Sequence, residues 1–386
     1  MIVMNEMRAD ARVDREASVL AASGNDVDVV ALRSHGLPEM ERRSGYVIRR
    51  VADYSRAAWT RPAAKIFQMR KRTATIVRCV ASLAPDVVHA HDTDALAPAC
   101  AAARATSAVL VYDAHELFPD MAGPSGRGRP LLVRSYWRSL ERRLVPCADS
   151  VITVGDGLAE ELARRYGIEA VVIRNAAPLQ PLQRGGRLRR ELGIAEDVPI
   201  VLYQGVLNAG RALDRLVRVV ASVPGAVLVL QGSGSEEGKL REIVAAHGLA
   251  DRVRLTGHVP QETLHEYACG ADVGVVIYEA TSLNNYYAAP NKLYAYLMAG
   301  LPIAASDFPG LREVVVDEEV GIVFDPADEA SIAESIRSLL SDPDSLEEMS
   351  ARARQLAETR YNWQMESRKL IDLYERLARE RTKAGR

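Results

Sequence analysis

The residues best placed to do chemistry lie near position 290, where a lysine follows a proline at the start of a predicted helix. The segment reads Ala289-Pro-Asn-Lys-Leu-Tyr-Ala-Tyr-Leu-Met-Ala-Gly-Leu-Pro302, with Pro290 suited to a first helical turn and Gly300 to the end. A helix start exposes unpaired N–H groups and about half a positive charge. Lys292 adds a mobile full charge there, beside Asn291 and Leu293. The pattern suits a phosphate or diphosphate, and a packed helix with a solvated lysine explains it equally well.

A second phosphate-binding candidate follows a predicted strand that ends in Tyr203-Gln-Gly205. Gly205 would let a diphosphate approach the backbone, and Arg211, just before the next helix, could hold two phosphate oxygens. A surface arginine is the alternative. We expect Arg211 and Lys292 to share one cleft, because parallel strands bind ligands beyond their carboxyl ends.

A glycine-rich turn, Gly232-Ser-Gly-Ser-Glu-Glu-Gly238, resembles a dinucleotide-binding loop only weakly. Its last glycine comes one residue late, and the next strand ends in Gly257-His-Val259 without an acid for a ribose diol. We therefore expect no nicotinamide or flavin cofactor, and we keep Gly234 as a candidate substrate-binding residue.

In the first half of the chain, Tyr112-Asp-Ala-His-Glu116 ends a predicted strand. His115 can donate to a sugar hydroxyl or take up a proton near neutral pH, so we predict that it contacts the substrate beside Asp113 and Glu116. A structural hydrogen bond is the alternative for this histidine.

Two further histidines, His89 and His91, lie in one strand, and we expect them to point to opposite faces, with His91 toward the substrate. A buried structural role is equally open for either. Asp92-Thr-Asp94 could hold a divalent metal, but the same spacing occurs at Asp26/Asp28 and Asp342/Asp344. We therefore predict no metal site.

The elements that must position these residues alternate between short Val/Ile-rich runs and amphipathic stretches, the pattern of parallel βα units. The pattern occurs twice, so we predict an α/β protein with two doubly wound Rossmann-like domains facing a central cleft. We assign residues 1–176 to the first domain, 177–186 to a linker and 187–361 to the second domain. A last helix in 362–386 needs a surface to cover, and the first domain is the candidate surface. The predicted strands are Met1–Asn5, Val27–Ala31, Val87–His91, Val109–Asp113, Val151–Val154, Val171–Arg174, Pro199–Gln204, Val227–Gln231, Val253–Thr256, Val273–Tyr278, Pro302–Ser306 and Gly321–Phe324.

Composition narrows the class of protein. The 386 residues allow two or three domains, and 48% apolar with 26% charged residues is typical of globular chains. A net charge of −2 provides no overall field to attract nucleic acid. The four cysteines form no CxxC pair and suggest reduced core residues. With no export signal and no membrane span in the sequence, we expect a cytoplasmic protein.

One stretch, residues 48–80, departs from the charge balance, with nine Lys or Arg against a single acid, Asp53. It could contact anionic lipid or an anionic acceptor, so peripheral membrane association is a hypothesis. A solvated helix with a core-facing apolar side is the more common explanation. The basic residues are Arg49, Arg50, Arg56, Arg61, Lys65, Arg70, Lys71, Arg72 and Arg78.

Taken in order, these segments resemble the retaining glycosyltransferases of family 4, which have two Rossmann-like domains (the GT-B fold). The resemblance runs nearly end to end, through Asp10-Ala-Arg-Val-Asp-Arg-Glu-Ala17, Val87-Val-His-Ala-His-Asp92, Tyr112-Asp-Ala-His-Glu116, Tyr203-Gln-Gly205, Gly257-His-Val259 and the helix after Pro290.

The resemblance implies transfer of a sugar from a nucleoside diphosphate to an acceptor, with retention and without a metal or other cofactor. It also implies that residues 1–176 form the acceptor-side domain and residues 187–361 the nucleotide-sugar domain. Arg211 and Lys292 would neutralise the diphosphate, with Asn291 at the helix start, and His115 would orient the donor sugar. His258 and Val259 would line the base, and the loop before Arg12 would close over the diphosphate. UDP is slightly favoured over GDP.

The chain departs from the family at three positions. Tyr287 and Ala295 replace two glutamates, the second of which holds the ribose, and Val206 replaces a second phosphate-binding arginine. Asn284, Asn285 or Lys292 could substitute. The alternatives are a catalytically lapsed homologue that binds a sugar nucleotide or supports a partner, and a nucleotide-sugar epimerase. The acceptor, the donor sugar and the oligomeric state are not specified by the sequence.

Overall fold

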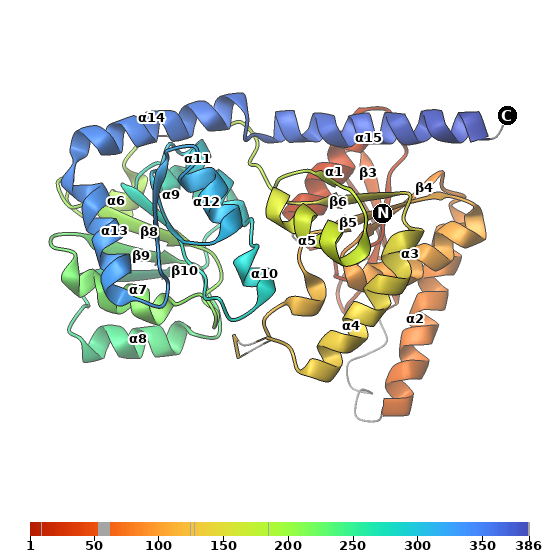
Figure 1. The fold of residues 1–386 in the computed structure, drawn as a ribbon, viewed down its shortest axis with the longest axis horizontal. Coiled ribbons are helices and arrows are strands. Elements are labelled where there is room, and N and C mark those ends of the chain that lie inside the picture. The colour runs from red at the N-terminus through yellow and green to blue at the C-terminus, as the bar shows by residue number, and fades with distance from the viewer. Residues whose placement is uncertain (9, 53–61, 124, 127, 184, 385–386) are drawn as a thin grey trace. The chain divides into compact units, whose positions relative to one another are not determined.

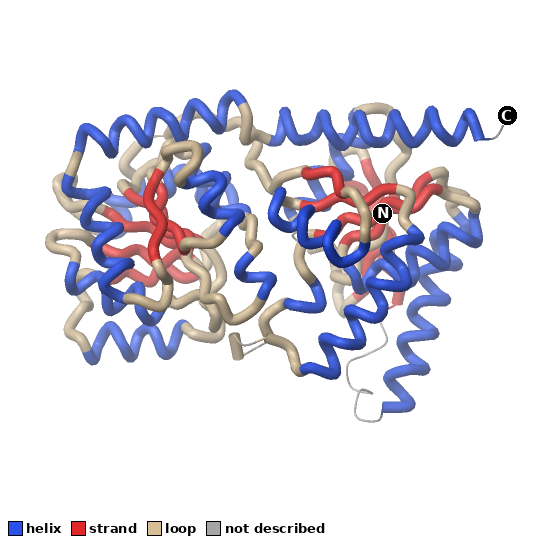
Figure 2. The backbone as a smooth tube through the Cα atoms, viewed as in Figure 1, coloured by secondary structure: helices blue, strands red, loops and turns tan. Residues whose placement is uncertain are grey.

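The computed structural model describes residues 1–8, 10–52, 62–123, 125–126, 128–183 and 185–384. It divides into two compact units. Unit 1 comprises Met1–Pro119, Leu131–Ile173 and Ser367–Arg386, and unit 2 comprises Asp120–Pro130 and Arg174–Glu366. In each unit, strands are enclosed by helices (Figure 2).

Unit 2 is built on a six-stranded sheet whose paired strands are all parallel and follow the order β10-β9-β8-β11-β12-β13. Relative to chain order this is the doubly wound arrangement 3-2-1-4-5-6, in which the direction of winding reverses between β8 and β11. The strands are β8 Ile200–Gln204, β9 Val227–Gln231, β10 Val253–Gly257, β11 Val273–Val276, β12 Ile303–Ser306 and β13 Gly321–Phe324.

Helices cover both faces of this sheet because its strands are apolar on both sides (Figure 1). In β8, Val201 and Tyr203 join the core formed with α7, α8 and α13, whereas Ile200 and Leu202 join the core formed with α9, α11, α12 and α14. The helices of unit 2 are α6 Arg187–Leu192, α7 Leu213–Val219, α8 Glu237–Ala246, α9 Leu264–Ala268, α10 Leu283–Tyr286, α11 Asn291–Met298, α12 Pro309–Val315, α13 Glu329–Ser341 and α14 Pro343–Thr359.

Unit 1 follows the same winding rule around Ile2. The backbone of Ile2 forms parallel bridges to Val30 in β1 and to Ala90 in β4, and so joins the sheets β1-β3-β2 and β4-β5-β6-β7. The winding direction therefore reverses between the Ile2 segment and β4, and the two chain segments that leave this point carry Arg12 and Asp92. The strands are β1 Asp28–Arg33, β2 Met40–Arg43, β3 Tyr46–Ala52, β4 Val87–His91, β5 Val109–Ala114, β6 Ser150–Thr153 and β7 Ala170–Val172.

The last helix, α15 (Trp363–Ala384), belongs to unit 1 from Ser367 onward. Leu370, Leu373 and Leu377 are buried at helical spacing, so one face of α15 is part of the core. The Tyr374 hydroxyl lies 2.8 Å from His89 Nδ1. The other helices of unit 1 are α1 Ala11–Ala22, α2 Pro62–Ser82, α3 Thr93–Thr106, α4 Leu131–Leu144 and α5 Asp156–Tyr166.

The predicted α/β class with Rossmann-like parallel sheets is confirmed. The β2–β3 hairpin was not predicted, because its outer strand is short, polar and partly exposed. The expected strand Met1–Asn5 is present only in part: Ile2 forms the sheet bridges, and Met1, Val3 and Asn5 exchange backbone hydrogen bonds with β1. The units divide between Ile173 and Arg174, a few residues before the predicted linker at 177–186.

All four cysteines are free thiols, and Cys100 is buried whereas Cys79, Cys147 and Cys269 are half-buried. Among the residues that the structure describes, we find no helix with the length and apolar character needed to span a bilayer.

Candidate functional site

The candidate phosphate site lies in unit 2, beyond the carboxyl ends of the neighbouring strands β8 and β11, where the direction of winding reverses. Ligands of doubly wound sheets bind beyond the carboxyl ends of the strands at this reversal point. Arg211 lies in the segment that follows β8, and Lys292 is the second residue of α11, the helix that β11 reaches through α10. The topology therefore brings together the two cations that the sequence analysis singled out.

Lys292 lies over an aromatic ring rather than extending into solvent as a mobile charge. Its Nζ is 3.6 Å from the ring centroid of Tyr203 and 5.9 Å from that of Tyr278. Gly205 makes this position possible: it has φ of +141°, and a Cβ there would lie 3.1 Å from Lys292 Nζ. The positive φ therefore favours glycine at this turn, and a Cβ there would crowd the end of the lysine side chain.

Arg211 lies over the second aromatic ring, with its guanidinium carbon 3.9 Å from the centroid of Tyr278. One of its terminal nitrogens is buried without a hydrogen-bond partner. The preceding turn is fixed by Asn285, whose buried amide donates to the carbonyls of Gly210 at 3.3 Å and Glu279 at 3.0 Å. Asn285 therefore holds the arginine loop and has little capacity left to replace a missing ligand-binding group.

The electrostatics of this site favour an anion. Burial, and then the charge of Arg211, hold the pKa of Lys292 well below its ordinary value. Across the described part of unit 2, neither cation has a carboxylate within ion-pair distance; only the faces of Tyr203 and Tyr278 compensate their charge. Two like charges held together without an acid form a site that an anion would stabilise.

The other predicted donor-site residues occupy varied surroundings. His258 and Asn291 are exposed, and Val259 packs beside the core. Leu293 is fully buried, and its N–H donates to the Pro290 carbonyl, so its side chain serves the core instead of a ligand. At Gly234, a Cβ would lie 2.4 Å from the Leu207 carbonyl oxygen, so packing of the protein's own loops explains this glycine.

The three departures from the family pattern lie around the same loops. Val206 is 53% exposed, and Tyr287 and Ala295 are half-buried. None of these side chains offers a charge, so the positive charge of the phosphate site rests on Arg211 and Lys292.

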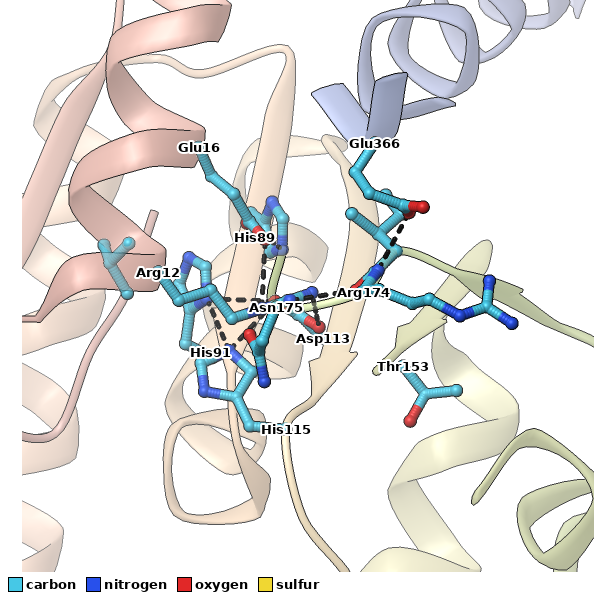
Figure 3. Close-up of polar contacts among 12 residues, drawn as sticks. Arg12, Glu16, His89, His91, Asp113, His115, Thr153, Arg174, Asn175 and Glu366 are labelled. Atoms are coloured by element: carbon cyan, nitrogen blue, oxygen red, sulfur yellow. Dashed lines mark hydrogen bonds and ion pairs between the residues drawn. The ribbon is translucent and has the colours of Figure 1, made fainter. Parts of the chain in front are cut away.

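Unit 1 contains a buried ionic cluster centred on Asp113 (Figure 3). Arg12 donates to both carboxylate oxygens of Asp113, at 2.8 and 2.9 Å, and to the Ile173 carbonyl at 3.0 Å. Glu16, one turn along α1, lies 3.0 Å from Arg12 Nε. Arg12 is buried in this network, so it ties α1 to β5 and to the residue that follows β7. The substrate contact expected of Arg12 is not available to its side chain in this arrangement.

His115 is held between two carboxylates. Its Nε2 lies 2.9 Å from Asp113 Oδ2, its Nδ1 lies 3.3 Å from Asp92 Oδ2, and its backbone N–H donates to Asp92 Oδ1 at 3.1 Å. Burial alone would lower the pKa of His115, but Asp92 and Asp113 more than offset this effect and raise the pKa to about 10. His115 therefore stays protonated near neutral pH instead of taking up a proton there.

Burial also sets the charge of the neighbouring groups. Burial would raise the pKa of Asp113, but Arg12 and His115 hold it well below its ordinary value. Burial lowers the pKa of His91 to about 4 and raises that of Glu16 to about 8, with Arg12 opposing the second shift. The cluster thus has ionised Asp113 between two cations, beside a neutral His91.

The expectation that His89 and His91 point to opposite faces is wrong. Their rings stack with centroids 4.4 Å apart and planes inclined by 12°. The reason is the period of a strand: residues i and i+2 lie on the same face. Both are buried, and His91 Nδ1 lies 3.2 Å from His115 Nε2.

Several residues of the two sites were not predicted from the sequence to have the roles that the structure gives them. Asp92 was considered only as a metal ligand, yet it orients His115 and has φ of +64°, a strained backbone typical of functional positions. Glu16, Tyr203 and Tyr278 carried no signal of their own, although Glu16 is four residues after Arg12 and faces the same side of α1. Glu116, which was predicted to lie beside the substrate, follows His115 in the chain and is half-buried.

Comparison with known proteins agrees with this architecture. A family model described as Glycosyltransferase Family 4 matches residues 10–180, and one described as Glycosyl transferases group 1 matches residues 186–356. The glycogen synthase of Mycobacterium tuberculosis is 30% identical over 289 residues, covering 72% of this chain and 66% of that protein. The D-inositol 3-phosphate glycosyltransferase of Xylanimonas cellulosilytica is 28% identical over 257 residues, covering 62% and 60%. These matches span 66% and 60% of the two relatives, respectively.

Solved structures show the same fold over almost the whole chain. Sucrose-phosphate synthase from Thermosynechococcus elongatus has a TM-score of 0.83 at 21% identity, covering 98% of both chains. Anabaena HepE in complex with UDP and glucose has a TM-score of 0.73 at 15% identity, covering 97% of this chain and 98% of HepE. With a family model on each half and these GT-B neighbours, the chain belongs to the family 4 glycosyltransferases of the GT-B fold.

Proposed function

We propose that this protein transfers a glycosyl group from a nucleoside diphosphate sugar to an acceptor, with retention at the anomeric carbon. The observation that carries the proposal is the pair Arg211 and Lys292, two cations that lie together on tyrosine rings without an acidic partner in the described part of unit 2. A diphosphate supplies the negative charge that this pair lacks.

The chemistry follows from where charge develops. Breaking the bond between the anomeric carbon and the diphosphate oxygen leaves negative charge on the diphosphate. Arg211 and Lys292, fixed in position before the reaction, stabilise that charge, and the N-terminus of α11 adds its dipole. The acceptor oxygen attacks the anomeric carbon from the face that the diphosphate leaves, and a diphosphate oxygen takes the acceptor proton. Because the side chains of Arg211 and Lys292 stabilise the charge on the leaving diphosphate, we expect transfer without an added divalent cation.

In unit 1, His115 is assigned to the donor sugar. Its side chain is 17% exposed, and its proton is held by Asp92 and Asp113. A protonated imidazole oriented in this way is a hydrogen-bond donor to a sugar hydroxyl rather than a base.

We propose that the nucleotide of the donor is UDP. The structures of HepE in complex with UDP and with UDP-glucose support this choice. Calorimetry with UDP and GDP, followed by a donor-hydrolysis assay with UDP-glucose and no added metal, tests it. We expect binding of one nucleotide and release of a sugar with unchanged anomeric configuration. Binding without turnover would favour a lapsed homologue, and an altered sugar still attached to its nucleotide would favour an epimerase.

We also propose that unit 1 contacts an anionic lipid surface. Part of the predicted segment 48–80 lies outside the described residues, and the clearest apolar surface in the described part of unit 1 belongs to α4 instead. Leu131 and Leu132 are 72% and 86% exposed, and Tyr136 is 50% exposed. Arg142 and Arg143 lie in the last turn of the same helix. Apolar and basic side chains on one exposed helix suit the interface of an anionic membrane.

A further inference from the structure

Four buried side chains of unit 1 meet in one small volume, to which α1 contributes Glu16, β4 contributes His89 and His91, and β5 contributes Asp113 (Figure 3). One potential ligand atom from each lies within 4.8 Å of the other three. All four residues are at most 3% exposed. Two imidazoles and two carboxylates at this spacing could surround a single metal ion.

Several polar atoms of this group are buried without a hydrogen-bond partner. They are His89 Nε2, His91 Nε2 and Glu16 Oε2, whereas Glu16 Oε1 forms an ion pair with Arg12 Nε at 3.0 Å. Buried polar groups are nearly always satisfied by protein, water or an ion. A cluster of unsatisfied nitrogen and oxygen atoms therefore points to an occupant.

The imidazole of His89 has the arrangement found in metal-binding histidines. Its Nδ1 is within hydrogen-bond distance of the Tyr374 hydroxyl, at 2.8 Å, whereas its Nε2 lies 3.9 Å from Glu16 Oε2. Metal-ligating histidines usually engage their second ring nitrogen in such a contact, which fixes the ring and its tautomer. The ring of His91, stacked on that of His89, is held in turn by Asp113, whose Oδ2 is 3.4 Å from His91 Nδ1.

The ligand set follows from the ion pairs already present. Asp113 remains paired with Arg12 and His115, so Glu16, His89 and His91 are the main ligands. A cavity of about 350 Å³ lined by Leu20, His89 and Tyr374, among others, gives an entry route on the His89 side.

We propose that Glu16, His89 and His91, with Asp113 beside them, bind one first-row divalent transition ion, of which Zn²⁺ is the best fit. Imidazole and carboxylate together suit Zn²⁺ and its neighbours, whereas Mg²⁺ and Ca²⁺ favour all-oxygen sites. The ion would join α1, β4 and β5 and, through Tyr374, α15. It is separate from the diphosphate chemistry, which the proposed function assigns to unit 2, and it revises the prediction that the chain has no metal site.

The test is metal binding by the full chain, measured without any glycosyl transfer. The protein is treated with a chelator and titrated with Zn²⁺ by calorimetry, and Co²⁺ is then bound to record its visible spectrum. We expect one equivalent of tight binding and a tetrahedral Co²⁺ spectrum without thiolate charge-transfer bands. Anomalous scattering at the zinc edge should place the ion beside His89.

Matched variants identify the ligands. Glu16→Gln keeps the size of the side chain but cannot supply a carboxylate ligand and should abolish the tight site. Tyr374→Phe removes only the contact to His89 Nδ1, so it should keep the fold and weaken Zn²⁺ binding by about 10–100-fold. His35→Gln, at an exposed histidine, is the control and should bind as the unchanged protein does.

The proposal is overturned if less than about a tenth of an equivalent binds. It is also overturned if Tyr374→Phe and Glu16→Gln bind like the unchanged protein, or if diffraction shows only a water molecule in the cluster. Circular dichroism of each variant shows whether a loss of binding reflects unfolding, and Tyr374→Phe decides the question if Glu16→Gln fails to fold.

Discussion

At the scale of single residues, the unusual feature of unit 2 is that tyrosine rings take the place of acidic partners. Tyr203 lies under Lys292, and Tyr278 lies under Arg211. An aromatic face attracts a cation but does not neutralise it, so both charges remain available to a ligand. A carboxylate at either position would pair with the cation and compete with a diphosphate.

Replacing Arg211 by alanine should lower turnover by about 10²-fold or more, because it removes a charge that stabilises the leaving diphosphate in the transition state. Steady-state kinetics on a UDP-sugar measures the effect. Arg241→Ala, at an exposed arginine of α8 that pairs with Glu237, is the matched control and should leave turnover unchanged. Near-normal turnover in Arg211→Ala would remove this arginine from the mechanism.

The lowered pKa of Lys292 gives donor binding a defined pH dependence. The pKa lies below 10.5 in the free protein, chiefly through burial and then through Arg211, and a bound diphosphate would raise it. Binding is therefore accompanied by proton uptake, and nucleotide affinity should fall as pH rises through the pKa of the free protein. Calorimetry in two buffers of different ionisation enthalpy measures the uptake.

Lys292→Met is the control for that measurement, since it keeps the length of the side chain and removes the proton. This variant should bind UDP more weakly and with little proton uptake. Equal uptake in both proteins would show that another group titrates on binding.

At the scale of elements, the ends of helices and strands decide which residues meet. Asn285 of α10 holds the loop that carries Arg211, and Gly205 at the end of β8 leaves room for Lys292 from α11. In unit 1, α1 carries Arg12 and Glu16 on one face, and β4 presents His89 and His91 on one side. Each site is thus assembled from short segments whose local geometry is specified but whose partners lie far away in the sequence.

The exposed face of α4 gives a prediction at this scale. Replacing Leu131 and Leu132 together by serine should reduce co-sedimentation with phosphatidylglycerol vesicles at low salt by about tenfold, because the apolar area available for insertion is lost. These side chains are largely exposed, so the melting temperature should change little.

Leu179→Ser, at a 43% exposed leucine of unit 2, is the control for the vesicle assay. Sedimentation of the α4 double variant at the level of the unchanged protein would contradict a membrane role for this helix.

At the scale of the whole molecule, the chain returns at its end to the unit in which it began. From Ser367 onward α15 belongs to unit 1, where Leu370, Leu373 and Leu377 are buried. Lys369 donates to the Val172 carbonyl, and Arg381 lies 2.9 Å from Asp86. The last helix is therefore a structural part of unit 1 and not an accessory tail.

Leu373→Ala should lower the free energy of unfolding of unit 1 by about 2–5 kcal/mol, since it leaves a cavity beneath α15. Hydrogen exchange measures the stability of each unit separately. The amides of β4 and β5 in unit 1 should lose protection, and those of β8 and β9 in unit 2 should not. Arg379→Ala, on the exposed side of α15, should leave both units unchanged. Unchanged protection of β4 in Leu373→Ala would show that α15 contributes little to this core.

The sequence by itself determined the alternation of strands and helices, the two series of βα units, and the two cations at strand ends of the second series. These features are local, because the side-chain period and the turn residues depend on near neighbours in the chain. The same reasoning identified Asp113 and His115 as candidates, but it left open the charge of His115.

Tertiary structure decided the rest. That Tyr203 and Tyr278 lie under the cations, that Asp113 is buried between Arg12 and His115, and that Glu16 meets His89 and His91 all depend on residues brought together from distant segments. Burial and neighbouring charges, which set the pKa values of Lys292 and His115, exist only once the chain has folded. The local pattern specifies which groups are present, and the packing of distant segments specifies what those groups can do.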